Sequence, residues 1–585
     1  MRWRISFLTL CCLLATPAWA QTGKGMVIFA DAVYYNGKVL TVDERFSIAQ
    51  AFAVREGKVM AVGSDAEILK LKGAKTQSLD LKGKTVIPGL IDTHTHVFDY
   101  AIDNGSEELA QMEPEMADYL RLVKIQAKSA ADAKIQLAEA VKKAKPNSIV
   151  HVEFTPDTPE EVSKLTLDDL DGIAATNPLI ARLPTGTRRL ANTLTFQLFE
   201  KHLGELPEGV EKDSQGRFIG KIDLGEIRIL KMEILVKKVE SLASVFKKEM
   251  QAFASYGITT WASTIISGKA MNAFNALDRK GEMPIRLAYA HRLAAPTFLQ
   301  SPDFHQRLGQ GTDYIWNMGS SSHSLDSSYP GLCTTLSAAE PVKAREICRS
   351  ERGTFQRKAM EEAVKIGHRI AGTHVAGDRS VDNFLDVIEE ASKAGGLTLD
   401  QIRAKQHAID HCALNPRADQ IERAKRLNII WSCGPKYMDR ADRVQRDYGE
   451  KYAHQWVVPV NSILKAGGRV VMETDDSRIS NKGTFYYIEH LVTRKDDRGR
   501  VWGPQEAIDR KIGLQMFTRW AAEYVLRDKL LGSLEPGKWA DFVILDRDFL
   551  LAPAEQISNI RPLMTAVAGK PVYTESDFAR VEGRQ

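Results

Sequence analysis

Two histidines separated by one residue follow a short apolar run. Residues 86–91 are apolar or small, and the chain then continues through Asp92 to His94 and His96. Because side chains alternate between the two faces of a strand, residues two apart point the same way. Both imidazoles can therefore face one point, and imidazole is the commonest protein ligand for zinc-like metals. The pair alone is a weak signal, since structural histidines also occur at this spacing.

Three later apolar runs also end in side chains that can bind a metal. These side chains are His374, His411 and Asp475, with Asp476 beside the last. In a parallel β/α barrel the C-terminal ends of the strands meet at one face, and the active site lies there. Four histidines and a carboxylate at such positions predict a metal centre, although any one of the histidines could equally be a core or capping residue.

The elements that must position these residues follow a regular pattern. Short apolar runs alternate with helical patterns, which favours parallel β–α units. We expect eight barrel strands, the number in a TIM-type barrel, at residues 89–96, 258–262, 285–290, 314–317, 369–375, 406–411, 429–433 and 469–473. A long insertion, roughly residues 98–251, contains strand-like runs at 148–154 and 179–183 and is predicted to cap the barrel mouth.

Strand-like runs near both ends predict a second, β-rich domain. They lie at residues 32–42, 51–54, 58–62 and 76–80, and again at 539–546, 563–567 and 570–574. We expect residues 26–85 and 533–578 to close one composite β-sandwich around a barrel domain at residues 86–532.

Composition and charge limit the class of partner. The 585 residues are 44% hydrophobic and 26% charged, as in a soluble globular protein. The net charge of +4 is small for this length and does not indicate a nucleic acid or a membrane surface. We expect a small-molecule substrate, and a homo-oligomer stays open.

The first 20 residues have the parts of a secretory signal peptide. Basic residues at the start precede an apolar stretch at residues 5–15 and the small residues of Ala18-Trp19-Ala20. The apolar stretch is shorter than the roughly 20 residues that a membrane span needs. We predict cleavage after Ala20 and a periplasmic or secreted mature protein beginning at Gln21.

Four cysteines remain after this cleavage. Cys333 and Cys348 flank a polar, loop-like stretch and can form a disulfide in an oxidising compartment, with two free thiols as the alternative. Cys412 and Cys433 lie in apolar, strand-like segments, so we expect buried free thiols there.

The chain resembles the amidohydrolase superfamily, in the branch called amidohydrolase family 3. The motifs that carry the resemblance are PGLIDTHTH at residues 88–96, THVAGDR at 373–379, IDHCAL at 409–414 and GSLEPGKWAD at 532–541. The resemblance covers nearly all of the mature chain, although Asp410 stands where the family more often has Glu. It implies an α/β fold: a distorted TIM (β/α)8 barrel with a composite β-sandwich and a long insertion after the first barrel strand.

The resemblance also implies roles for the candidate ligands. His94, His96, His374, His411 and Asp475 correspond to metal ligands, and Asp475 also to the residue that handles the proton. A bound zinc lowers the pKa of its water to near 7. Asp475 would accept the proton of this water and return it to the leaving amine, while His411 or the metal polarises the substrate carbonyl. Asp476 is the second choice for this role.

Two departures from the family pattern change the expected site. The fourth strand has Tyr314, Trp316 and Met318 where many members have a carboxylated lysine and an aspartate, which argues against a bridged second metal. We therefore predict one zinc held by His94, His96, His374 and Asp475, with His411 orienting water or substrate. In the insertion, the usual Asp-Gly-His signature is replaced by PTGTRR at residues 184–189, followed by Asn192.

Several polar side chains are candidates for binding the substrate. They are Arg188 or Arg189 and Asn192 in the insertion, Lys436 after the seventh strand and Arg478 after the eighth. Basic side chains suit a carboxylate or phosphate, so an anionic substrate such as an N-acyl amino acid is one hypothesis. Pairing of these arginines with ordinary acidic neighbours is the alternative. His291 could support the site, and a structural role is favoured for it.

Three functions agree with these residues. The first is hydrolysis of a carbon–nitrogen bond other than a peptide bond, favouring a linear amide. The second is deamination of an amino-substituted ring, which would release ammonia instead of a carboxylic acid. The third is an exported binding or regulatory protein that keeps the fold without catalysis, and only the missing lysine supports it.

Overall fold

The computed structural model describes most of the chain. The described residues are 28–155, 157–184, 188–203, 213, 215, 217–223, 231–265, 267–293, 308–322, 324–343, 346–475 and 483–581. The predicted signal peptide lies outside them, as do Asp476 and Arg478. Among the described residues, no helix combines the length and the apolar character that crossing a bilayer requires.

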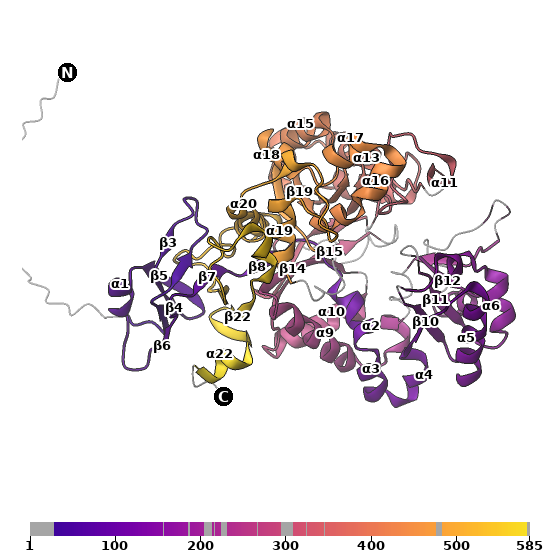
Figure 1. Cartoon of the computed structure of the whole chain (residues 1–585), viewed down its shortest axis with the longest axis horizontal. Coiled ribbons are helices and arrows are strands. Elements are labelled where there is room, and N and C mark those ends of the chain that lie inside the picture. The colour runs from indigo at the N-terminus through magenta and orange to yellow at the C-terminus, as the bar shows by residue number, and fades with distance from the viewer. Residues whose placement is uncertain are drawn as a thin grey trace, which may run out of the picture.

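Eight parallel strands form the centre of the molecule, in two four-stranded sheets (Figure 1). The first has the order β16-β15-β14-β8 and the second β17-β18-β19-β20. Their bounds are β8 Leu90–Asp92, β14 Ile258–Ile265, β15 Arg286–Arg292, β16 Ile315–Ser321, β17 His374–Gly377, β18 Ala408–Leu414, β19 Ile430–Cys433 and β20 Arg469–Met472. A bridge between Ser320 and Ile370 joins one side of the two sheets. On the other side, the amide of Asp475 donates to the carbonyl of His94 at 2.9 Å. The fold is α/β of TIM-barrel type.

Each of the eight predicted runs overlaps one of these strands, but their bounds differ. The run predicted at residues 369–375 becomes a strand only from His374 onward. Gly372 has a φ of 72°, which interrupts the extended backbone just before that strand. The local pattern of apolar residues shows where a strand lies better than where it begins.

Helices lie around the strands, and their apolar faces explain their packing. In α13 (Asp378–Ala394) the side chains of Val381, Phe384, Leu385 and Ile388 are buried, at the spacing of one helix face. The other helices after β14 include α10 Gly268–Arg279, α12 Phe355–Lys365, α14 Leu399–Lys405, α15 Ala418–Leu427, α16 Ala441–Tyr448, α17 Glu450–Gln455, α18 Val460–Lys465, α19 Phe485–Thr493, α20 Arg510–Met516 and α21 Arg519–Tyr524.

The two ends of the chain meet in a pair of sheets, at the left of Figure 1. One sheet has the order β5-β4-β1-β6 and the other β23-β22-β21-β7-β2-β3. Their bounds are β1 Ala32–Tyr35, β2 Lys38–Leu40, β3 Ile48–Ala49, β4 Ala51–Arg55, β5 Lys58–Gly63, β6 Gln77–Asp80, β7 Thr85–Pro88, β21 Phe542–Leu545, β22 Pro562–Val567 and β23 Lys570–Thr574. The rings of Tyr34 and Phe52 stack at 4.6 Å, and both meet Phe542 edge to face. The domain boundaries stay predictions.

A further sheet lies between β8 and β14 in the sequence and at the opposite end of the molecule from the terminal sheets (Figure 1). Its order is β13-β12-β11-β10-β9, and it has its own apolar core. The elements of this segment include α2 Val97–Asn104, α3 Ser106–Met112, α4 Ala117–Leu120, β9 Leu122–Ile125, α5 Ala130–Lys143, β10 Val150–Phe154, α6 Leu167–Ile173, β11 Leu179–Arg182, β12 Arg188–Ala191, α7 Thr193–Leu203, β13 Lys221–Asp223 and α9 Val239–Ala254. Of these strands, only β10 and β11 were predicted from the sequence. β9, β12 and β13 each contain at least one charged residue and carry no continuous apolar run. Its role as a cap over the barrel mouth stays a prediction.

All four cysteines in the described part of the chain form disulfides. Cys333 pairs with Cys348, and Cys412 pairs with Cys433. The prediction of buried free thiols at Cys412 and Cys433 was therefore wrong. These cysteines lie on the neighbouring strands β18 and β19, where His411 is in register with Cys433. Strand neighbours are set by the tertiary fold, so the composition around each cysteine did not show the pairing.

Candidate metal centre

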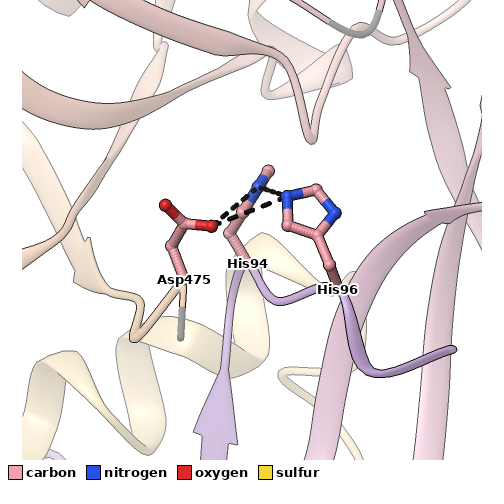
Figure 2. A group of neighbouring side chains, drawn as sticks. All are labelled: His94, His96 and Asp475. Carbon is pink, nitrogen blue, oxygen red and sulfur yellow. Dashed lines mark hydrogen bonds and ion pairs between the residues drawn. The ribbon is translucent and has the colours of Figure 1, made fainter. Parts of the chain in front are cut away.

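His94, His96 and Asp475 converge at the C-terminal ends of β8 and β20 (Figure 2). The Nε2 atoms of His94 and His96 lie 3.1 Å apart. One carboxylate oxygen of Asp475, Oδ1, lies 3.5 Å from Nε2 of His96 and 3.9 Å from Nε2 of His94. Each residue thus offers one ligand atom to a common point. Both histidines lie beyond the end of β8 at Asp92, so strand alternation is not what brings them together.

The backbone around Asp475 fixes the direction of this side chain. Asp475 has a φ of 41°, in the left-handed region that non-glycine residues seldom adopt. One oxygen of the buried Asp92 accepts from the amides of His94 and Thr474, at 3.3 and 3.0 Å. Asp92 therefore ties the end of β8 to the end of β20, and so places Asp475 next to the two histidines.

The second oxygen of Asp475, Oδ2, is held from the other side. Nζ of Lys436 lies 2.9 Å from it, and the hydroxyl of Tyr437 donates to it at 3.0 Å. Burial opposes ionisation of Asp475, but Lys436 and the neighbouring histidines outweigh it and hold the pKa of this carboxyl well below its usual range. The carboxylate is therefore ionised and available as a ligand through Oδ1.

Two buried carboxylates hold the candidate histidines from behind. Oδ2 of Asp410 lies 2.7 Å from Nδ1 of His94, and Oε1 of Glu473 lies 2.5 Å from Nδ1 of His411. Such partners orient metal-binding imidazoles and fix which nitrogen faces the metal. Neither role was predicted from the sequence. The available signal was that Asp410 directly precedes His411, and that Glu473 precedes Asp475 by two residues.

His374 and His411 lie beside this cluster, with ring centroids 4.1 Å apart. Nε2 of each is buried and has no hydrogen-bond partner in the described part of the chain. Burial lowers the pKa of His411 to about 3 and that of His374 well below its usual value, so both rings are neutral. The carboxylate nearest Nε2 of His374 is Asp326, at 3.7 Å.

These features fit a divalent cation. An unpartnered, buried imidazole nitrogen is costly in a folded protein, and a metal ion satisfies it. Burial, together with the nearby charges of Asp410 and Asp475, raises the pKa of Glu473 well above its usual value, although the charge of His94 opposes this shift. A cation held by these ligands would add positive charge near Glu473 and so favour its ionised form.

The predicted substrate-binding residues differ in their position relative to the candidate metal ligands. Lys436 contacts Asp475, so it belongs to the cluster. Asn192 is buried in the inserted segment, where its amide group bonds to backbone groups and to Thr195 and contacts none of the candidate ligands. Arg188 begins β12, but its side chain lies outside the described residues, as does Arg478.

The place of the missing lysine is filled by structural side chains. Trp316 is buried and donates its ring N–H to the carbonyl of Val525 at 2.7 Å. Tyr314 lies over the guanidinium of Arg286, at 4.8 Å from the ring centroid. Met318 is buried in the barrel interior, and His291 is buried at the end of β15. None of the four is in the group of His94, His96 and Asp475.

The fold and the cluster together are those of a metal-dependent hydrolase, and comparison with known proteins gives the family. The model of the amidohydrolase family matches residues 77–573, and the chain belongs to this family. It is a metal-dependent enzyme that hydrolyses carbon–nitrogen bonds.

Two curated relatives align with most of the chain. An N-substituted formamide deformylase of Arthrobacter pascens is 24% identical over 93% of this chain and 98% of its own length. The protein LONG AFTER FAR-RED 3 of Arabidopsis thaliana is 26% identical over 93% of this chain and 92% of its own length.

Solved structures share the fold. An uncharacterized metal-dependent hydrolase of Pyrococcus horikoshii OT3 has a TM-score of 0.64 at 22% identity, over 89% of this chain and 99% of that one. A similar hydrolase of Pyrococcus furiosus has a TM-score of 0.62 at 21% identity, over the same shares of the two chains.

Proposed function

We propose that this amidohydrolase is an exported zinc enzyme that hydrolyses a linear amide, such as an N-acyl compound. The observation that carries the proposal is that the two carboxylate oxygens of Asp475 have different partners. Oδ1 faces two histidines, whereas Oδ2 is held by Lys436 and Tyr437. The linear amide is favoured because the relative from Arthrobacter pascens, which aligns over 93% of this chain, is a deformylase of N-substituted formamides.

The metal would be held by His94, His96 and Asp475, with His374 as the fourth ligand. The donor set of imidazoles and one carboxylate suits zinc. When bound there, zinc supplies Lewis acidity and lowers the pKa of water toward 7. Because the described residues of the fourth barrel strand include no lysine, one metal per chain is the expected content.

Asp475 handles the proton in this proposal. Its carboxylate is ionised and fixed, so Oδ1 can accept a proton from the attacking water. It then returns this proton to the leaving nitrogen, which would otherwise depart as an unstable anion. Lys436 and Tyr437 hold Oδ2 throughout and so prevent the carboxylate from rotating away from the reacting atoms.

His411 serves as an acceptor rather than as a donor. The raised pKa of Glu473 favours its protonated form in the metal-free chain, whereas a bound cation would favour the ionised form. The proton that they share would then reside on Nδ1 of His411 and leave the Nε2 lone pair bare. A bare lone pair can receive a hydrogen from water or bind the metal, but it cannot donate to a substrate carbonyl. We therefore assign His411 to the orientation of water.

Export of the enzyme is supported by its cysteines as well as by its first 20 residues. Disulfides persist in oxidising compartments such as the bacterial periplasm, and the described residues contain two. The N-terminus of the protein recovered from the periplasm should be Gln21, as measured by mass spectrometry. A cytoplasmic protein that still begins at Met1 would contradict export.

The test of the activity is metal content followed by substrate hydrolysis. Elemental mass spectrometry after dialysis should find close to one zinc per chain, and close to two would reveal a further site. The enzyme should release carboxylic acid from neutral N-substituted formamides or from anionic N-acyl amino acids, and the better substrate decides whether the site prefers a charge. Release of ammonia from aminated rings alone would establish a deaminase instead. A chain that refuses zinc would contradict the proposed zinc site.

A further inference from the structure

Tyr524 reaches the interior of the barrel from the end of α21, beyond the last barrel strand. Its side chain is buried among Trp316, Met318, Ala371 and Val471, which form the packed interior of the barrel. It is not one of the residues whose ligand atoms converge on the metal position. Its hydroxyl nevertheless lies within hydrogen-bond distance of the groups that support the candidate ligands.

Two hydrogen bonds fix this hydroxyl. It donates to Oδ1 of Asp410 at 2.9 Å, and it accepts from the amide of Gly372 at 3.1 Å. Asp410 is the third residue of β18, and Gly372 lies two residues before His374. The hydroxyl therefore connects the strand that supports His94 with the segment that leads into His374.

The ring of Tyr524 is held as firmly as its hydroxyl. The guanidinium of Arg369 lies over it at 5.4 Å from the centroid, within the range of a cation–π contact. Arg369 itself donates to the carbonyls of Met318 and Gln406, at 2.7 and 2.8 Å. The tyrosine is thus a rigid support for the groups that it contacts.

Asp410 depends on this support because both of its oxygens are assigned. Oδ2 holds Nδ1 of His94 at 2.7 Å, and Oδ1 has Tyr524 as its side-chain partner. The carboxylate is fully buried. Without the tyrosine hydroxyl, one oxygen of a buried carboxylate would lose its partner, and the carboxylate could rotate away from His94.

We propose that Tyr524 is a positioning residue for the metal centre, acting on His94 through Asp410. The proposal rests on the metal site of the proposed function. Partners behind a metal ligand typically change metal affinity by 10- to 100-fold when they are removed. We expect Tyr524→Phe, which removes only the hydroxyl, to weaken zinc affinity by about 10-fold.

The experiment is a zinc titration of the full metal-free chain against a competing fluorescent chelator. It compares the unmodified protein with Tyr524→Phe, Asp410→Asn and the double variant. If Tyr524 acts through Asp410, Tyr524→Phe as a single change should weaken zinc binding. In the Asp410→Asn background the same change should cause no further loss of zinc affinity. Tyr34→Phe, at a buried tyrosine of the terminal sheets, is the matched control and should leave zinc affinity unchanged.

The possible outcomes distinguish the existence of the metal site from the role of Tyr524. Failure of the unmodified chain to bind zinc overturns the metal centre. Binding by the unmodified chain with no loss in Tyr524→Phe, or with additive losses in the double variant, overturns the role of Tyr524. A fluorinated tyrosine at position 524 keeps the hydroxyl and covers the case in which Tyr524→Phe does not fold. Its fluorine resonance should shift on addition of zinc, and an unchanged resonance also overturns the inference.

Discussion

Asp475 shows how much a single side chain depends on its neighbours. Oδ1 faces His94 and His96, whereas Oδ2 is occupied by Lys436 and Tyr437. The lysine keeps the carboxylate charged, and the tyrosine limits its rotation. The same group can then bind a metal and accept a proton without losing its orientation.

Replacing Asp475 by Asn should abolish most of the turnover and leave the fold intact. The amide keeps the size of the carboxylate but cannot accept the proton of the attacking water. General acid–base catalysis is typically worth 10²- to 10⁴-fold, so we expect a fall in kcat of about that size. The measurement is kcat on the best amide substrate, with the thermal unfolding midpoint as the check on folding. Full activity in Asp475→Asn would sink the proton-handling role.

Lys436 should set the acidic limit of activity. Removing its charge by Lys436→Met raises the pKa of Asp475, because an opposite charge at 2.9 Å favours the ionised carboxylate. Asp475 then becomes protonated, and so inactive as an acceptor, at a higher pH. The acidic limb of the pH–rate profile should move upward by about 1 to 3 units. Lys436→Arg keeps the charge and is the control, and an unmoved limb in Lys436→Met would show that the lysine does not act on Asp475.

At the scale of elements, strands β18 and β19 are joined next to the site. Cys412 follows His411 directly, and its disulfide to Cys433 links the two strands. His411 and Cys412 both have positive φ, at 98° and 54°, and such backbone conformations persist only where the surroundings impose them. The disulfide is one of those surroundings.

Removing this disulfide should therefore affect both stability and metal binding. The double change Cys412→Ala and Cys433→Ala opens a loop with a sequence separation of 21, and loops of this size are worth about 3 kcal/mol in free energy of unfolding. Zinc affinity should fall as well, because His411 loses its imposed conformation. Urea unfolding and the zinc titration measure the two effects. Cys333→Ala with Cys348→Ala is the comparison for stability. Unaltered zinc affinity in the variant that lacks Cys412 and Cys433 would contradict the coupling between this disulfide and the metal site.

At the scale of the whole molecule, a buried ion pair connects the terminal sheets to the barrel. Arg286 begins β15, and its Nε and Nη2 donate to the two oxygens of Asp541, at 2.7 and 2.9 Å. The backbone amide of Ala568 also donates to Asp541, at 2.7 Å. The last aspartate of the C-terminal motif thus holds the two parts of the molecule together.

Breaking this pair should destabilise the protein strongly. Asp541→Asn leaves the buried guanidinium of Arg286 without an opposite charge, and such changes cost about 3–5 kcal/mol in free energy of unfolding. The control is Glu555→Gln, which breaks the exposed pair with Lys495 and should cost less than about 1 kcal/mol. Urea titration followed by tryptophan fluorescence measures both, and equal losses in the two variants would contradict the assigned role of Asp541.

How much of this structure the sequence predicts depends on the range over which each interaction acts. Apolar runs are a local property, so they located the eight barrel strands. Strand alternation does not explain the approach of His94 and His96, because β8 ends at Asp92. The bounds were less accurate, as at Gly372, because a single turn of the backbone moves the start of a strand.

The sequence by itself determined the class of fold and the class of enzyme, and it named the residues of the candidate metal centre. Only the tertiary structure decided what holds those residues: Asp410 behind His94, Glu473 behind His411, and Lys436 against Asp475. The disulfide between Cys412 and Cys433 belongs to the same group. These contacts join residues of different strands and loops, many of them distant in sequence. A carboxylate, a lysine or a thiol carries no local sign of which partner the fold will bring within hydrogen-bond distance.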